Sequence, residues 1–363
     1  MAALLARSGL SVVVLEKRQP GDEKTCAGGV LQRALVHVSD CLPFPTEDNG
    51  ISQLLLTCRG QDLIDRETKT PVFATVLRSD FDAHLQHHAQ LAGAKTLFGT
   101  TVSQVDESAQ GVRVVAGDLE IEATVVVGAD GADSIVARQS GLAGTRLEPA
   151  VTMRVSSSML HRFRHCAAID WDTPPGGYSW IFPKSDHLSV GAGGPRADKS
   201  LLLKGAQEHL RRHFGDDYSI LDTRSAFLPV FAPNMRRSTS RALLVGDAAT
   251  LVDPFTREGI SWTLWSAHVA SEAVVGFVRG QNDLGVYDCL LERELLPELR
   301  AAASVAEWFY ADAKSAQSRL RSSHTWEQFC GLLDGSVSHR QLRRKLFPLR
   351  VLSWIRSLRA GLR

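Results

Sequence analysis

The sequence lacks the features that mark several large classes of protein. No apolar run reaches the roughly 18 residues that a membrane span needs, and the apolar stretch 123–127 has only the length of a strand. The six cysteines are widely spaced and form no C-x-x-C pair, which argues against a zinc site and a disulfide scaffold and for a reducing cytoplasm. The formal net charge is only +1, so no overall field attracts nucleic acid. With 363 residues and 44% hydrophobic content, we expect a cytoplasmic globular enzyme that holds no metal.

Apolar runs without polar alternation predict three buried parallel strands, at residues 11–16, 123–128 and 241–245. Between them, residues 151–193 have the pattern of strands around a hairpin turn at 174–177. Parallel strands interrupted by an antiparallel insertion predict an α/β fold, in which a Rossmann-like domain carries a β-sheet substrate domain. The predicted boundaries place residues 1–45, 75–145 and 225–285 in the Rossmann-like domain, residues 46–74 and 146–224 in the β-sheet domain, and residues 286–363 in a helical C-terminal region with a basic tail.

Glu16 follows the first buried strand, where a carboxylate can accept hydrogen bonds from the hydroxyls of a nucleotide ribose. The usual companion of such an acid is a G-x-G-x-x-G loop roughly 20 residues upstream. That loop and the strand before it are absent, because only 15 residues precede Glu16. Residues 2–8 look like the end of the helix that should follow the loop. Either the sequence starts late or the protein lacks this pyrophosphate clamp, and Glu16 alone is equally well explained as a surface residue.

The segment 241–270 carries the strongest signal. Its buried strand delivers Asp247 to the carboxyl end, where a short acid can bind a sugar-alcohol hydroxyl such as that of the ribityl chain of FAD. Pro254 bends the chain, and Gly259 and Ile260 begin a helix with no bulky side chain in front of its N–H groups. We expect these N–H groups to stabilise the anionic reduced ring of a flavin.

A second strand–turn–helix covers residues 125–134. Gly128 and Gly131 permit a tight turn, and Asp130 can either brace the amides of that turn or contact the cofactor. Both interpretations are open.

Four motifs stand in the order of the FAD-dependent hydroxylase-like flavoproteins, which the chain resembles. They are L-E-K at 15–17, R-x-x-F-D-x-x-L at 78–85, G-A-D-G-A-D-S at 128–134 and G-D-A-A…D-P…E-G-I at 246–260. Two further segments are similar to geranylgeranyl reductases: P-G-D…C-A-G-G at 20–29 and Y-S-W-I-F-P-K…V-G-A-G at 178–193. The resemblance covers roughly residues 1–290.

The resemblance implies FAD as the cofactor and the reduction of isolated C=C bonds in isoprenoid chains. It also implies NAD(P)H or a small electron-transfer protein as a transient reductant, since no second dinucleotide domain is visible. Arg257 departs from the family pattern, because it stands where glycine is usual and adds bulk and charge beside the flavin site. The positions that match FAD contacts of the family are Glu16, Cys26, Ala27, Gly29, Arg78, Val102, Asp247, Gly259 and Ile260, to which Asp130 is added from its own turn.

Cys26 and one aromatic strand are the candidates for catalysis and substrate binding. Near a flavin, the Cys26 thiol is suited to donate the proton that completes reduction after hydride delivery; a small filler in a tight turn explains it equally well. Tyr178, Trp180 and Phe182 share strand parity and therefore point to one face. An aromatic face suits a polyprenyl substrate, and it equally suits a sheet that packs on its own core.

The end of the sequence is basic and amphipathic. Beyond Asp334 there is no acid, but there are seven arginines and Lys345. A helix within residues 339–363 is able to rest on an anionic membrane or to pack on the body of the protein. The first reading predicts peripheral membrane contact.

Two rival functions remain open from the sequence. Flavin monooxygenases and halogenases share the flavin motifs, and the Y-x-W-x-F-P run resembles a halogenase motif, although no convincing catalytic lysine accompanies it. The other rival is a non-catalytic remnant that no longer binds FAD tightly.

Overall fold

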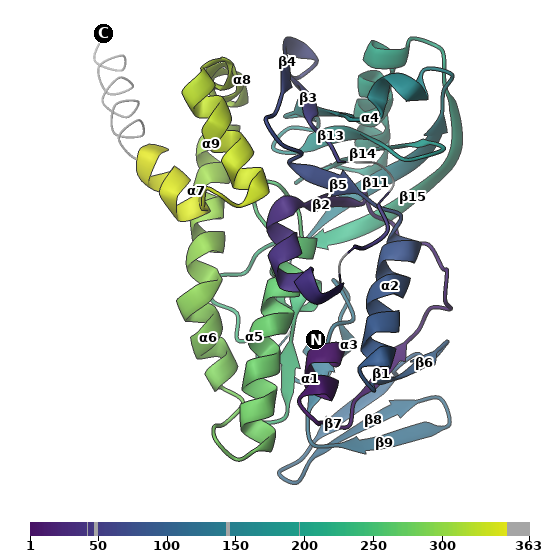
Figure 1. The fold of residues 1–363 in the computed structure, drawn as a ribbon, viewed down its shortest axis with the longest axis vertical. Coiled ribbons are helices and arrows are strands. Elements are labelled where there is room, and N and C mark those ends of the chain that lie inside the picture. Colours follow the sequence, from purple (N-terminus) through teal and green to yellow (C-terminus); the bar gives the residue numbers. More distant parts are fainter. Residues whose placement is uncertain (42, 47–49, 143–145, 196, 347–363) are drawn as a thin grey trace.

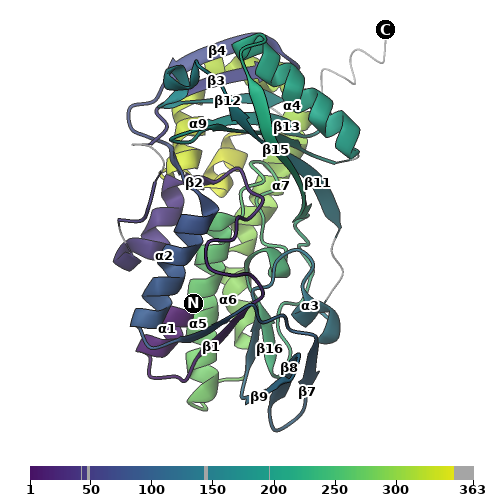
Figure 2. The same ribbon diagram turned by 90° about the vertical axis from the view of Figure 1, so that its right-hand side faces the viewer.

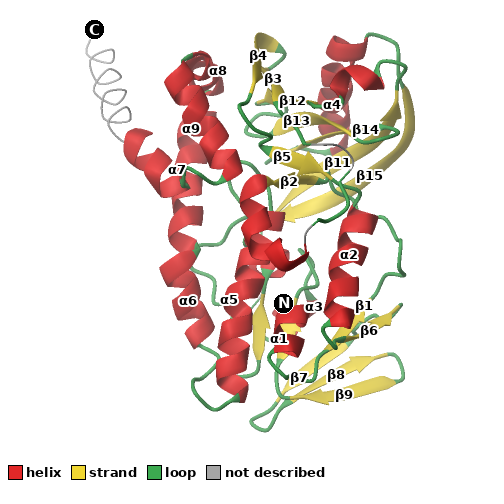
Figure 3. Ribbon diagram, viewed as in Figure 1, coloured by secondary structure: helices red, strands yellow, loops and turns green. Residues whose placement is uncertain are grey.

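The computed structural model describes residues 1–346 except 42, 47–49, 143–145 and 196. Figure 1 shows a large sheet in the upper half, a set of smaller sheets in the lower half, and long helices along one side of both. Figure 3 shows the same division by type of element.

The three predicted strands are confirmed, and they lie in two parallel pairs in the lower half. Their predicted burial is confirmed only for β16: β10 is mostly half-buried, and β1 is half-buried with Val13 exposed. β1 (Val13–Glu16) pairs with β6 (Lys95–Phe98), and β10 (Val126–Gly128) pairs with β16 (Ala242–Leu244). An antiparallel meander lies nearby, made of β7 (Gln104–Glu107), β8 (Val112–Ala116) and β9 (Leu119–Ala123). Apolar side chains of these strands pack against α3 (Ile135–Gln139), α5 (Ile260–Val278) and α6 (Val286–Glu294). This core corresponds to the predicted Rossmann-like part of the fold.

The inserted sheet has seven strands in the order β15-β11-β14-β13-β12-β3-β4. Their bounds are β3 (Gln53–Cys58), β4 (Gln61–Glu67), β11 (Leu147–Ser156), β12 (Cys166–Trp171), β13 (Tyr178–Pro183), β14 (Leu188–Gly193) and β15 (Ser219–Pro229). All neighbours run antiparallel, as predicted, except β12 and β3, which run parallel. The exception arises because β3 comes from a distant segment, whereas a tight hairpin can join only antiparallel neighbours.

Helices cover both faces of this sheet. α4 (Lys199–Phe214) packs on one face, where Leu202 and Leu210 meet Val151 and Ile181. α7 (Leu296–Ala311), α8 (Ala313–Ser318) and α9 (Ser323–Asp334) pack on the other face near β3 and β12 (Figure 2). The aromatic strand β13 lies in the middle of the sheet, so its two faces meet different cores.

The remaining elements lie between and around these sheets. They are α1 (Ala2–Arg7), β2 (Gly29–Leu31), η1 (Gln32–Cys41), β5 (Phe73–Thr75), α2 (Arg78–Leu91), η2 (Leu160–Phe163), η3 (Gly246–Ala249), η4 (Arg319–Arg321) and a last helical segment at 339–346. Helix α1 lies where the end of a helix was predicted, and it contacts α2 and α5. In the described part of the chain, no helix combines the length and apolar character needed to cross a membrane. Of the predicted basic tail, residues 347–363 lie outside the described residues.

Candidate functional site

The start of α5 meets the carboxylate of Asp247. A Cβ atom added to Gly259 would lie 2.9 Å from Oδ1 of Asp247, so the two positions touch only because residue 259 is glycine. Among the described residues, no group donates a hydrogen bond to this carboxylate, and the N–H groups of Gly259 and Ile260 have no acceptor. A largely enclosed carboxylate beside free N–H groups at a helix start has both acceptors and donors to offer a polar ligand. The residues present therefore fit the ribityl chain and the flavin edge expected here.

One N–H group at the start of α5 is not free, contrary to the expectation from the sequence. The N–H of Ser261, in the first turn of α5, donates to Oε1 of Glu258 at 2.6 Å. The helix start is therefore only partly free, and a carboxylate lies directly behind it. Sequence reasoning had treated Glu258 only as part of a motif.

The turn at residues 26–29 is held rigidly. Gly28 has φ +70°, and an added Cβ would lie 2.3 Å from the carbonyl oxygen of Val76 and 2.6 Å from Nζ of Lys184. Lys184 Nζ donates to the same Val76 carbonyl at 2.8 Å, and the N–H of Gly28 donates to Sγ of Cys26 at 3.3 Å. This arrangement fixes the position of the Cys26 thiol, with Ala27 next to it.

Charged groups from three segments gather around Cys26. The Arg78 guanidinium, at the start of α2, contacts Cys26 and forms two 2.9 Å hydrogen bonds with Asp82. Lys24 lies among the same groups, and its pKa is lowered by the positive charge of Arg78 and by burial. Burial raises the pKa of Asp247, against the opposing charges of Lys24 and Arg78. The structure thus brings together Cys26, Arg78 and Asp247; Lys24 was missed, although its place two residues before Cys26 was a usable signal.

A pocket opens between this group and the upper sheet. Its wall includes Lys24, Cys26, Arg78, Arg154, Lys184 and Arg224. The arginines from the sheet are half-exposed and share Glu23 as an ion-pair partner, at 3.0 Å from Arg154 and 2.7 Å from Arg224. Cationic groups outnumber acids in this wall, so the pocket suits an anionic group.

Three other residues that were predicted to contact the cofactor are not part of the group around Cys26. Glu16 ends β1, and its Oε1 accepts the N–H of Arg18 at 2.9 Å. Val102 is partly buried against the lower core. Asp130 accepts hydrogen bonds from Ser134 at 2.5 Å and from the N–H of Ile135 at 2.7 Å, so it braces the start of α3. Cofactor contact by these three residues stays a prediction.

The aromatic strand presents one face, as its parity predicts. Tyr178, Trp180 and Phe182 all belong to the core cluster shared with α7–α9, whereas Ile181 faces α4. Much of this aromatic face is packed: Trp180 is 6% exposed and the Tyr178 hydroxyl donates to the carbonyl of Thr256 at 2.6 Å. Phe182 lies nearest to the cysteine turn, since a Cβ added to Gly29 would be 3.2 Å from its ring. A substrate role for this strand stays a prediction, centred on Phe182.

Arg257 points away from the helix start and fills a structural role. Its backbone is left-handed, with φ +55°, a conformation that favours glycine. Its guanidinium pairs with Glu148 at 3.0 Å and donates to the Gly176 carbonyl at 2.6 Å and the Tyr310 hydroxyl at 3.1 Å. The side chain therefore links the loop before α5 to β11, to the turn before β13 and to α7.

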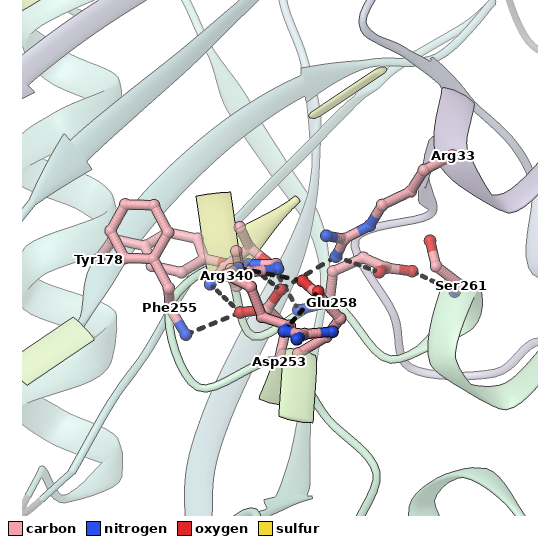
Figure 4. A network of polar contacts seen from close by, with 10 residues as sticks. Arg33, Tyr178, Asp253, Phe255, Glu258, Ser261 and Arg340 are labelled. Carbon is pink, nitrogen blue, oxygen red and sulfur yellow. Dashed lines mark hydrogen bonds and ion pairs between the residues drawn. The ribbon is translucent and has the colours of Figure 1, made fainter. Parts of the chain in front are cut away.

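A second group of charges lies behind the start of α5 (Figure 4). Nη2 of Arg33, on η1, donates to Asp253 at 3.0 Å and to Glu258 at 3.2 Å. His339 reaches the same oxygen of Asp253, with Nε2 at 3.0 Å. Burial raises the pKa of Glu258 against the effect of Arg33, while His339 and Arg33 overcome burial and hold the pKa of Asp253 far below its ordinary value. Sequence reasoning missed this group, because its members are too far apart in the chain to form a motif.

Comparison with known proteins shows the family to which the chain belongs. A family model described as FAD binding domain matches residues 1–166. The digeranylgeranylglycerophospholipid reductase of Methanothrix thermoacetophila is 31% identical over 301 residues, which cover 78% of this chain and 76% of that protein. Digeranylgeranylglycerophospholipid reductase 1 of Methanopyrus kandleri is 27% identical over 360 residues, which cover 88% and 92%.

Solved structures share the fold. A geranylgeranyl bacteriochlorophyll reductase-like protein of Thermoplasma acidophilum superposes with a TM-score of 0.76 at 20% identity, over 85% of this chain and 84% of that one. A flavin-dependent brominase superposes with a TM-score of 0.75 at 19% identity, over 97% and 96%. The family model and the shared fold both indicate FAD as the cofactor. The chain belongs to the geranylgeranyl reductase family, whose members are FAD-dependent oxidoreductases that act on C=C bonds.

Proposed function

We propose that this protein reduces isolated C=C bonds in the isoprenoid chain of a lipid with an anionic head group. The observation that carries the proposal is the meeting of Asp247, which has no hydrogen-bond donor among the described residues, with the free N–H groups at the start of α5. Asp247, Gly259 and Ile260 would hold the ribityl chain and the flavin edge, and Arg78 with the turn at 26–29 would line the other side.

FAD, when bound and reduced, supplies the hydride for one carbon of the double bond. Cys26 would give the proton to the other carbon, because its sulfur is held in a rigid turn at the pocket wall. The thiolate left behind would lie beside the Arg78 guanidinium and would regain its proton from solvent. The sum is one hydride and one proton added across the C=C bond.

The basic pocket supports an anionic head group. It lies on the same sheet face as the aromatic strand, since Arg154 is opposite Ser189 on β14, which is opposite Phe182 on β13. Across this face, the side chains therefore change from aromatic to basic. An apolar chain near Phe182 and a phosphate near Arg154 and Arg224 would match that change.

A halogenase-like role is less well supported by the geometry. Lys184 is the lysine of the Y-S-W-I-F-P-K run, and its Nζ is buried against the carbonyls of Val76 and Gly28. It lines the pocket beside Cys26, but its Nζ is engaged with these backbone carbonyls and stabilises the cysteine turn. The reductant is proposed to be NAD(P)H or a small electron-transfer protein, and peripheral membrane contact through residues 339–363 would bring the enzyme to its substrate.

The proposal is tested by anaerobic incubation of FAD-loaded protein with a geranylgeranyl phospholipid and dithionite. Mass spectrometry should show two added hydrogens for each reduced double bond. Replacing Cys26 by alanine should slow this reduction by about 100-fold, the low end for loss of a general acid, while flavin reduction stays unchanged. The exposed Cys289 on α6 provides the control variant Cys289→Ala. Unchanged turnover in Cys26→Ala would remove this thiol from the mechanism, and a parent that hydroxylates or halogenates in air would favour the rival function.

Arg224→Gln tests the head-group pocket. We expect the KM for a phosphate-bearing isoprenoid to rise about tenfold, since a half-exposed charge-assisted hydrogen bond contributes roughly 1.5 kcal/mol, with the KM for the uncharged prenol unchanged. Arg113→Gln is a matched control, because Arg113 also pairs with two acids and its side chain is 40% exposed, against 41% for Arg224. Equal effects on charged and uncharged substrates would contradict the proposed pocket. An effect confined to NAD(P)H-driven turnover, and absent with dithionite, would assign the pocket to the phosphates of the reductant.

A further inference from the structure

The loop between Asp253 and Gly259 is fixed by two buried carboxylates whose oxygens are all engaged. Oδ1 of Asp253 accepts the N–H groups of Phe255 and Thr256 at 2.8 and 3.1 Å. Its Oδ2 faces Arg33 and His339, each at 3.0 Å. These contacts determine where the loop ends and therefore where α5 begins.

His339 belongs to the last described helical segment, at 339–346, and is far from the flavin motifs in sequence. Its side chain is 3% exposed, and its ring centroid lies 6.0 Å from that of Trp262, in the first turn of α5. The Arg33 guanidinium lies over the same indole at 5.1 Å. The C-terminal segment thus reaches the start of α5 through one buried histidine.

The charges of this group act close to the proposed flavin position. Glu258 directly precedes Gly259, whose N–H is free for a ligand among the described residues. Two carboxylates face Arg33, and the ring of His339 lies at ion-pair distance from one of them, with Nε2 3.0 Å from Oδ2 of Asp253. Because solvent is largely excluded here, the balance of these charges is weakly screened. Any excess of negative charge would disfavour an anionic reduced flavin at the helix start.

We propose that His339 is a positioning residue for the flavin site: it holds the loop 253–259 through Asp253 and offsets its negative charge, so that the midpoint potential of bound FAD depends on this C-terminal histidine. The inference rests on the flavin site proposed above. It assigns the C-terminal segment a part in the redox chemistry, although that segment carries no flavin motif.

The test compares His339→Leu and His339→Gln with the parent, using the FAD-loaded full chain without lipid substrate. Midpoint potential is measured by reductive titration, and FAD affinity by fluorescence. The leucine variant should have a lower midpoint potential and about tenfold weaker FAD binding, since the buried carboxylate of Asp253 loses one polar neighbour. Glutamine keeps a polar side chain near Asp253 but lacks the imidazole ring, so the potential of this variant should lie between those of the leucine variant and the parent. His324→Leu, at an exposed position on α9, is the control and should behave as the parent does.

A midpoint potential equal to that of the parent in both His339 variants would overturn the proposal. If the leucine variant does not fold, the glutamine variant decides alone, and a potential equal to that of the parent overturns it. A parent that binds FAD but reduces no isoprenoid would overturn only the proposed function, and a parent that binds no FAD would overturn both.

Discussion

Gly259→Val should weaken FAD binding by about 100-fold while the protein stays folded. The valine Cβ would start 2.9 Å from Oδ1 of Asp247 and 3.4 Å from Cγ2 of Val252, so the carboxylate must move out of its place. The branched side chain would also cover the free N–H groups of the helix start. Loss of two polar contacts to the cofactor corresponds to about 2.8 kcal/mol. Flavin fluorescence titration and far-UV circular dichroism measure the two parts of the prediction.

Gly285→Val provides a close control for this substitution. Gly285 is also the residue before a helix, α6, and its added Cβ would lie 3.0 Å from a carboxylate oxygen, that of Asp283. It should leave FAD affinity unchanged. Equal affinity in the parent and Gly259→Val would show that the start of α5 does not face the cofactor.

Arg257→Gly should destabilise the protein by about 2 kcal/mol, although glycine suits the left-handed backbone better. Relief of strain at φ +55° favours the variant by roughly 1 kcal/mol. Against this, removing one partner of a buried ion pair costs about 3–5 kcal/mol, and among the described residues Glu148 would keep one ion-pair partner, Arg146 at 3.9 Å. The lower end applies because both partners are about a tenth exposed, at 10% and 13%. A thermal melt should show Tm lower by several degrees.

Glu148→Gln in the Arg257→Gly background separates the two contributions. It removes the unpaired carboxylate and should recover part of the lost stability. A Tm equal to or above that of the parent in Arg257→Gly alone would mean that backbone strain exceeds the ion pair and its hydrogen bonds.

Local patterns in the sequence were sufficient to predict the strands whose apolar residues follow a clear pattern. Apolar runs located β1, β10 and β16, and strand parity gave the shared face of Tyr178, Trp180 and Phe182. The strand β4 was not predicted, because only Ile64 among its seven residues is buried and the pattern of an apolar face is absent. The parallel pairing of β3 with β12 also has no local signal, since it depends on how distant segments meet.

The parts of the candidate site that lie in one short motif could be predicted from the sequence. The parts that are formed by residues far apart in the chain could not. Asp247 and Gly259 stand 12 positions apart in one strand–turn–helix, and their contact follows from that unit. Arg33 and Asp253 stand 220 positions apart, and nothing in either neighbourhood indicates the other. Arg257 shows a third case: its bulk was evident, but the direction of its side chain depends on partners in three other elements.

The parallel contact between β3 and β12 has a consequence for synthesis on the ribosome. β3 is enclosed between β4 and β12, so the sheet remains open at this edge until residues 166–171 have left the exit tunnel. A nascent chain whose residues 166–171 are still inside the tunnel therefore exposes the apolar edge of β3, and chaperone binding or aggregation is expected at that stage.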